Sequence, residues 1–502
     1  MYLSKLVGLK ILMQMITKVL STKGIVATLL FFGGNYVIKR AKKYFKVTQY
    51  VDRGIIYTCD QLFELDHIIS TFSSQYSSRA EHILKELVSI PGKYDQNDIF
   101  RCAFDTITNA LISENAVFGR SNIFVDNGNL ISILMDPHDN SPFEKRKVVL
   151  ITHDLSSLGF ECDWGSGFGF DPYNGEIDFE SLDTEKIRLI NPRIPSSNLW
   201  DNLIIGNGTC GGLQGIASTI ISQKILVETS GLGSLKGCIV ISSFSFEKHH
   251  PYISVYGNQI YPDVIICAEA TGTPEIGPCN IALGQLGKSI IRVEIGDNDL
   301  SLFSQISENY KWMCGSNPSG HSFLGKSSYE CTLDAENSTI HFCRTLVPGD
   351  PPGKARTEID DLPTMIYLKS AKKSHAIVEV EHIPPFITPI DERSVLAATD
   401  SYRRTVSPWI DNDCDPEIPK QHINFIKRYK SECVAGYPAK MPVPSNKKWM
   451  KTGKFVSPPI LCIGAGFPEL SGKPGEFVFF DHLQQPIALV ARFPSLFIKE
   501  FK

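Results

Sequence analysis

Short apolar runs, each bounded by turn residues, recur through the middle of the chain. They cover residues 122–125, 130–135, 148–152, 203–205, 238–242 and 264–267, and a helical stretch at 216–228 separates the fourth from the fifth. Strands buried on both faces appear as near-continuous apolar runs, and parallel strands need long crossovers, usually helical. The pattern therefore predicts an α/β fold with a mostly parallel sheet flanked by helices.

Residues 286–385 follow a different pattern. It predicts a strand at 289–295, a helix at 300–312, strands at 327–333 and 338–346, a helix at 352–368 and a strand at 376–382. This β-α-β-β-α-β order is that of the ferredoxin-like module. We therefore expect an inserted domain at this place in the chain.

Helical spacing predicts four further helical segments outside that insertion. The first begins near residue 66 and stops at Pro91-Gly92, and the others cover 96–113, 397–405 and 418–430, before a last strand at 459–464. A chain of 502 residues exceeds one ordinary hydrophobic core. We expect an N-terminal extension (1–65), an α/β domain in two parts (66–285 and 386–502), and the insertion between them (286–385).

The charge balance excludes one large class of partner. Lys and Arg total 50 against 54 Asp and Glu, a net charge of −4 with a pI near 6.3, which gives no basic footprint for nucleic acid. The 13 cysteines are odd in number and include no Cys-x-x-Cys pair, which is typical of reduced thiols rather than a disulfide framework. This predicts a cytoplasmic protein.

The N-terminus leaves membrane association open. Residues 1–20 and 24–38 are largely apolar, and a basic cluster follows at Arg40, Lys42, Lys43 and Lys46. The second stretch is shorter than the roughly 20 residues that span a bilayer, and no signal-peptide cleavage site follows. A basic amphipathic helix on a membrane surface, a helical hairpin packed on the body, and a leader upstream of the true start remain as alternatives.

Three acid or imidazole groups stand where predicted central strands end. His153 follows the run at 148–152, Glu247 follows the run at 238–242, and Glu269 follows the run at 264–267. Ligands of open α/β sheets gather at the carboxyl ends of the strands. Imidazole and carboxylate groups at one edge suit a divalent metal, although such residues also serve as caps or solvated turn residues.

A glycine-rich segment, Gly206-Asn-Gly-Thr-Cys-Gly211, precedes the helix expected at 216–228. It matches the G-x-G-x-x-G pattern of dinucleotide binding, but the next strand lacks the acidic residue that such a site requires. It also contains a G-x-C-x-G sequence like a nucleophile elbow, for which His422 or His482 would have to serve as base. The simpler interpretation is a turn that lets the helix pack closely on the sheet.

Several segments in a consistent order resemble the dinuclear zinc hydrolases that include acetylornithine deacetylase, succinyl-diaminopimelate desuccinylase and aminoacylases, a family also counted among the metallopeptidases. The resemblance runs from about residue 66 to the C-terminus and rests on 170–175, 206–210, 269–272, 283–287, 344–349 and 459–476. It implies a zinc-exopeptidase-like sheet with the insertion as lid or dimerisation domain, and thus a homodimer. It also implies zinc and amide hydrolysis.

The chain departs from that family at its ligand positions. The resemblance places the bridging Asp at Gly211, a carboxylate ligand at Lys248 and the last His at Gly472. His153, Glu269 and Glu247 remain, the last as general base. Arg344 resembles the family's strand-end arginine and is expected to clamp a substrate carboxylate, with a plain surface role as the alternative.

Three hypotheses follow. The first is a hydrolase fold that has lost its dinuclear zinc site and binds a small-molecule or peptide ligand without hydrolysing it. The second is a hydrolase of acylated amino acids or dipeptides with one zinc or other divalent ion on His153, Glu269 and either His249 or His250, and with Glu247 as base. The third is a scaffold tethered to a membrane through residues 1–46.

Overall fold

The computed structural model describes residues 60–90, 96–159, 202–246, 253–255, 258–273, 277–296, 300–316, 320–321, 324–334, 339–351, 353–406, 426–428, 447, 450–452 and 455–498, with residues 173, 185 and 188. All of them belong to the unit Cys59–Lys502. The extension expected at 1–65 lies almost wholly outside the described residues. Among those residues, no helix is both long and apolar enough to cross a membrane.

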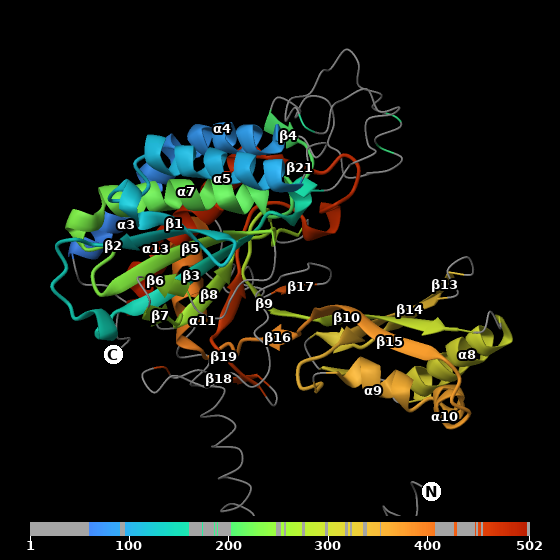
Figure 1. The fold of residues 1–502 in the computed structure, drawn as a ribbon. Helices are drawn as coiled ribbons and strands as arrows, with labels where there is room; N and C mark the ends of the chain where they lie inside the picture. The colour runs from blue at the N-terminus through green and yellow to red at the C-terminus, as the bar shows by residue number, and fades with distance from the viewer. Residues whose placement is uncertain are drawn as a thin grey trace, which may run out of the picture. The chain divides into compact units, whose positions relative to one another are not determined.

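A mixed sheet forms the centre of the α/β part (Figure 1). Its order is β1-β2-β5-β3-β8-β20-β9-β16, and β17 also pairs with β9. The pairs β5-β3, β3-β8 and β8-β20 are parallel, whereas β1-β2, β2-β5, β20-β9 and β9-β16 are antiparallel. The strands are β1 (Ile123–Asp126), β2 (Asn129–Met135), β3 (Lys147–Asp154), β5 (Cys238–Ser245), β8 (Val264–Cys267), β9 (Ala282–Gln285), β16 (Phe386–Ile387), β17 (Ile426–Arg428) and β20 (Ile460–Cys462).

The predicted α/β fold is confirmed, with a mixed sheet. Its parallel centre consists of β3, β5, β8 and β20, whereas the expected runs at 122–125 and 130–135 form the antiparallel strands β1 and β2. One run behaves differently: β4 (Leu203–Ile205) leaves the central sheet and pairs antiparallel with β21 (Phe477–Phe479). A three-residue apolar run does not indicate which strand it pairs with. The sequence pattern therefore grouped this run with those of the main sheet. The β4-β21 pair brings together two loops that become important at the candidate site.

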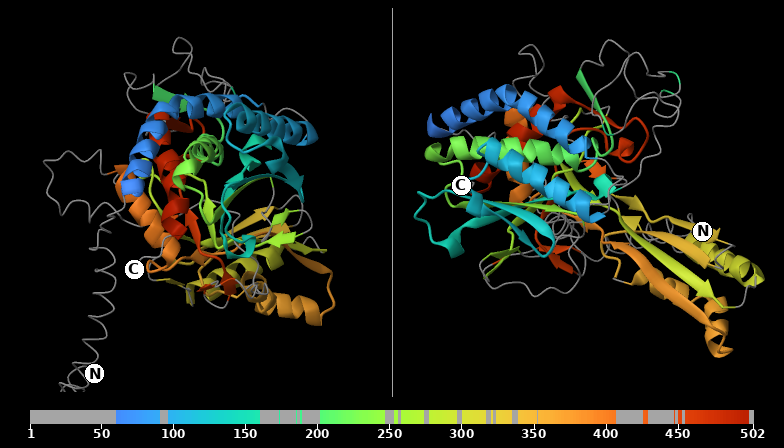
Figure 2. Two further views of the ribbon diagram at one scale, coloured as in Figure 1. Left: turned by 90° about the vertical axis from the view of Figure 1, so that its left-hand side faces the viewer. Right: turned by 45° about the horizontal axis from the view of Figure 1, so that its top comes forward.

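Helices gather on one face of the sheet, and the hairpin β6-β7 (Ile253–Val255 and Asn258–Ile260) lies on the other (Figures 1 and 2). Helix α7 packs against α4 and α13, and α13 packs against α3 and α11. On the hairpin face, apolar side chains of β2, β3, β5, β8 and β20 form a core with Ile253 and Ile260. The helices are α3 (Asp60–Gln75), α4 (Ser77–Val88), α5 (Gln96–Ser113), α7 (Leu213–Glu228), α11 (Arg393–Val406) and α13 (Gln484–Ile498).

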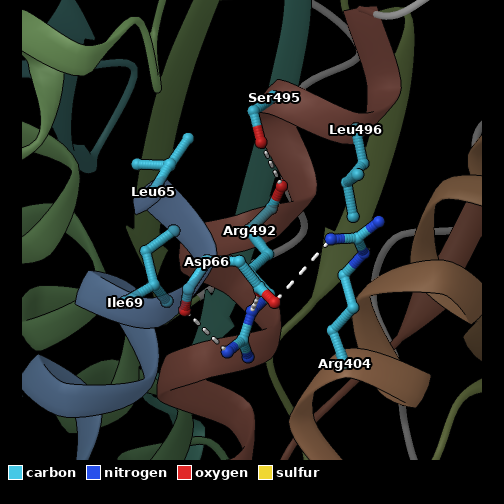
Figure 3. A pocket seen from close by; sticks show the side chains of 7 residues that line it. All are labelled: Leu65, Asp66, Ile69, Arg404, Arg492, Ser495 and Leu496. Carbon is cyan, nitrogen blue, oxygen red and sulfur yellow. Dashed lines mark hydrogen bonds and ion pairs between the residues drawn. The ribbon is translucent and has the colours of Figure 1, made fainter. Parts of the chain in front are cut away.

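An ion-pair cluster joins α3, α11 and α13 around a small cavity (Figure 3). Arg492 of α13 contacts Asp66 and Ser70 of α3, and it donates to Thr405 Oγ1 of α11 over 2.6 Å. Arg404 approaches the second oxygen of Asp66 at 3.7 Å. The Arg492 side chain is only 3% exposed, so this guanidinium depends on protein partners rather than on water.

The expected ferredoxin-like module is present as a separate four-stranded antiparallel sheet of order β13-β14-β10-β15. Apolar side chains of the sheet pack against its helices around Ile291, Phe342 and Tyr310. Its elements are β10 (Gly287–Ile295), α8 (Leu300–Ser316), β13 (Tyr329–Asp334), β14 (Thr339–Leu346), α9 (Lys354–Asp360), α10 (Pro363–Ser370) and β15 (His375–Ile383). Three short hairpin pairs complete the described elements: β11 (Gly320–His321) with β12 (Gly325–Lys326), β18 (Met450–Thr452) with β19 (Phe455–Ser457), and β6 with β7.

Two helix predictions need correction. The helix expected at 352–368 is two helices, because Leu362 adopts an extended conformation before Pro363, the first residue of α10. The helix expected at 418–430 contains β17, which pairs with β9, while its other residues lie outside the described part. The four domain ranges expected from the sequence stay a prediction.

Candidate functional site

His153, an expected metal ligand, lies in β3 with its ring completely buried. Its Nδ1 is 3.2 Å from the carbonyl oxygen of Ser243, and its Nε2 is 2.9 Å from Thr219 Oγ1 of α7. The ring also stacks on Phe244, with centroids 4.5 Å apart. Both nitrogens thus contact protein groups on the helical side of the sheet, which is the environment of a structural imidazole.

Glu269 follows β8, the strand beside β3, so the structure places the two expected ligands at neighbouring strand ends. The residue is 8% exposed. Its carbonyl oxygen approaches Gly464 so closely that a Cβ built on Gly464 would lie 2.4 Å from it. Thr271, two residues on, donates from Oγ1 to the carbonyl oxygens of Asn280 and Gly464. This turn is therefore fixed by backbone packing.

The remaining candidates for a metal centre, Glu247, Lys248, His249 and His250, lie outside the described residues. Within the described residues, no group of three or more His, Cys, Asp or Glu side chains is arranged to hold a metal ion. His153 and Glu269 alone do not supply the three protein ligands that a catalytic zinc normally has. The described donor set therefore does not fit a zinc centre.

The glycine-rich segment 206–211 is held by a glutamate that the sequence analysis did not single out. Glu476 is completely buried, and its Oε1 accepts hydrogen bonds from the backbone N–H groups of Cys210 and Gly211, the latter at 2.9 Å. Its Oε2 accepts from the N–H groups of Gly208 at 3.3 Å and Gly472 at 2.9 Å. Burial raises the pKa of Glu476 to about 7, although the four amides oppose that rise.

The two glycines at expected ligand positions, Gly211 and Gly472, belong to the loops that Glu476 joins. A Cβ on Gly211 would meet Gly208 O at 3.4 Å and Ser471 Oγ at 3.6 Å, whereas a Cβ on Gly472 would meet nothing within 4 Å. Gly472 has a φ of +71°, a conformation that residues with a side chain rarely adopt. The backbone there is thus adapted to glycine.

Helix α7, which follows the loop, approaches the sheet as closely as its glycines allow. A Cβ on Gly212 would lie 2.0 Å from the carbonyl oxygen of Asp154, and one on Gly215 would lie 1.7 Å from that of Ala268. Side chains at these two positions would push α7 away from the ends of β3 and β8. This close packing is the simpler of the roles expected for the glycine-rich segment.

Cys210, the residue that a nucleophile elbow would use, is fully buried. Its Sγ donates to the carbonyl oxygen of Phe477 over 2.7 Å. Burial, with a smaller effect of the Glu476 charge, raises the pKa of the Cys210 thiol well above its usual value. A nucleophilic cysteine needs a lowered pKa and access to substrate, so this thiol has the character of a core residue.

Arg344, the expected substrate clamp, is 1% exposed and forms a two-pronged ion pair within the inserted module. Its Nε is 3.0 Å from Glu358 Oε2, and its Nη2 is 3.1 Å from Glu358 Oε1. Glu358 comes from α9 and also lies 3.9 Å from Lys354. The edge of the guanidinium formed by Nε and Nη2, which could bind a substrate carboxylate, therefore already binds the carboxylate of Glu358.

Two titratable groups, the buried Glu476 and the half-buried His482, are expected to change stability with pH in opposite directions. Glu476, with its pKa raised to about 7, keeps a proton in the folded protein that the unfolded chain loses above its ordinary value of 4.5. Its contribution to the unfolding free energy is therefore full below that value and is lost as pH rises to about 7. Burial lowers the pKa of His482 to about 4, so its contribution is present above 6.5 and is lost as pH falls.

The variant Glu476→Gln isolates the first effect. We expect the unfolding free energy of the unmodified protein, minus that of the variant, to fall by about 3 kcal/mol between about pH 4 and about pH 8. Urea denaturation across that range measures the difference. The variant His482→Phe should give a change of similar size and opposite sign, and a Glu476→Gln difference that is constant with pH would contradict the expectation.

The fold is similar to that of two dipeptidases of known structure over most of the chain. Human carnosine dipeptidase 1 superimposes with a TM-score of 0.51 at 11% identity, covering 86% of this chain and 99% of its own. A dipeptidase of Saccharomyces cerevisiae gives 0.52 at 9% identity, with coverages of 87% and 99%. An M20 family metallo-carboxypeptidase of Sulfolobus solfataricus gives 0.49 at 12%, with coverages of 83% and 99%.

At the level of sequence, no protein-family model matches the chain, and no curated protein matches it either. The structural likeness thus establishes the α/β fold with its inserted module, as the family resemblance predicted. At 9–11% identity the likeness to these two dipeptidases shows the fold alone.

Proposed function

We propose that the protein is a divergent relative of the M20 hydrolases that has no dinuclear zinc centre and binds a small molecule or peptide without hydrolysing it. The observation that carries this proposal is the chemistry at the two loops expected to hold metal. Glycines occupy the ligand positions 211 and 472, and the carboxylate of Glu476 is bound to the loop amides.

The state of the other expected ligands supports the same function. Both His153 nitrogens contact protein groups, so metal binding there would require breaking the contact with Ser243 or Thr219. Arg344 is paired with the carboxylate of Glu358 through its Nε and Nη2 nitrogens. Among the described residues, His153 and Arg344 thus both have partners within the chain, which favours a structural use of these two positions.

The one-metal hydrolase remains the rival hypothesis, because Glu247, His249 and His250 lie outside the described residues. The full-length protein should be incubated with zinc and a panel of dipeptides and N-acylated amino acids, with product amines followed over time. We expect no turnover above a heat-denatured sample. Zinc-dependent turnover that is lost in both His153→Ala and Glu269→Gln would overturn the proposal in favour of the rival.

A His153→Ala variant that keeps full activity would count against the one-metal hydrolase. If turnover appeared and His153→Ala retained all of it, His153 would be excluded as a metal ligand. The matched control is His138→Ala, at a histidine in the turn after β2 for which no contact with the candidate site is seen.

A further inference from the structure

Glu476 connects two loops that are far apart in the sequence. One loop, 206–211, joins β4 to α7, and the other, 471–476, leads into β21. The carboxylate accepts four backbone hydrogen bonds, three from the first loop and one from the second. The same loops are joined at their outer ends by the β4-β21 pair, in which Ile205 is opposite Phe477.

The four bonds use the acceptor capacity of the carboxylate fully. Each oxygen takes two N–H groups, and an ionised carboxylate offers about four lone-pair sites. No ion pair between Glu476 and a Lys, Arg or His is present within the described part of the chain. The four N–H dipoles converge on the carboxylate just before the N-terminus of α7, as in an anion-binding nest, and they oppose the rise in the Glu476 pKa that burial causes.

We propose that Glu476 is a positioning residue, an internal carboxylate ligand that occupies a backbone amide nest and holds the 206–211 and 471–476 loops together. The loops carry Gly211 and Gly472, the positions at which a bound metal would otherwise join them. One buried carboxylate orders this edge of the fold without a cation. The inference is independent of whether the protein binds a ligand, because it concerns only contacts within the chain.

Hydrogen exchange followed by mass spectrometry tests this directly on the full-length protein in the presence of a chelator, at a pH of about 8, where the Glu476 carboxyl group is ionised. In the unmodified protein, peptides covering 206–212 and 470–476 should exchange at least about tenfold more slowly than unstructured peptides of the same sequence. Exchange at the unstructured rate in both peptides would overturn the proposal without any variant being made.

The variant Glu476→Gln should speed exchange at least about tenfold in both peptides together, because its side-chain NH₂ faces N–H groups that need an acceptor. Exchange in 96–113 should stay within about twofold, since none of the four hydrogen bonds to Glu476 comes from α5. The matched control Glu144→Gln makes the same change on the exposed η2 turn (Phe143–Lys145) and should leave 206–212 unchanged. Acceleration in only one loop, or equal acceleration in the control, would contradict the proposal.

The variant Glu476→Ala tests the nest as a carboxylate site. Acetate has the two carbons that this substitution removes, so added acetate should restore slow exchange in both loops, whereas neutral acetamide should not. Restoration by acetamide to the same extent would show that the space is filled without any need for a carboxylate. A variant that stays fast with acetate while retaining the fold elsewhere would show that the amides do not form a nest on their own.

Discussion

Replacing Arg492 by leucine is expected to lower the unfolding free energy by about 4 kcal/mol. The guanidinium is nearly inaccessible to water and serves groups on two other helices, Asp66 and Thr405. Its removal leaves the Asp66 carboxylate without its nearest cation in a partly buried place, since Arg404 lies farther off at 3.7 Å. Urea denaturation followed by circular dichroism measures the change.

The matched control for this prediction is Arg101→Leu on α5. The Arg101 side chain is 84% exposed and lies 4.0 Å from Asp105, a solvent-screened pair expected to contribute less than about 0.5 kcal/mol. If the Arg492 variant changed stability no more than this control, the three-helix cluster of Figure 3 would have no role in holding α3, α11 and α13 together.

The second large effect is expected from Gly215→Ala, which should destabilise the protein by about 3 kcal/mol. Helix propensity alone predicts the opposite sign, because alanine is favoured over glycine inside a helix by about 1 kcal/mol. Close packing dominates here, since the added Cβ would lie 1.7 Å from a backbone oxygen that the end of β8 holds in place.

The control substitution is Gly231→Ala in the η5 turn (Ser230–Leu232), where an added Cβ would meet nothing within 4 Å. It should leave the midpoint of urea unfolding nearly unchanged. A Gly215→Ala protein as stable as the unmodified chain would mean that α7 can move away from the sheet without loss, and the tight contact described above would be wrong.

Much of the fold was predictable because local pattern and tertiary role agree. The helix at 96–113 has the bounds expected from its periodicity. The inserted module has its expected order, and in its strands β10 and β14 buried residues alternate with half-buried ones. Long, strongly periodic segments of this kind carry their own secondary-structure information.

Other elements depended on information that no local pattern contains. Helix α13 was missed because Pro486 and Pro494 interrupt an otherwise apolar run, and proline is normally read as a helix breaker. Pro486 lies in the first turn, where a missing N–H matters little, but Pro494 lies inside the helix, which packs against α7 and α11. Tertiary packing there outweighs the local preference.

The candidate site was predictable in part. The resemblance identified Gly211 and Gly472 as departures, and those positions lie in the two loops that meet at the site. Glu476 ends the segment 459–476, on which the family resemblance rests, and this position was the signal in the sequence that pointed toward it. Its four amide partners lie 4 to 268 residues away in sequence, and only the folded backbone brings them together.

The claim that the protein has no dinuclear zinc centre is tested most directly by its metal content. The chain should be purified without a His-tag, dialysed against zinc with no chelator, and measured for bound metal per chain by elemental mass spectrometry. We expect a value near zero. About one zinc ion per chain would favour the one-metal hydrolase built on His153 and Glu269, and about two would contradict the account and assign the protein to the active zinc hydrolases.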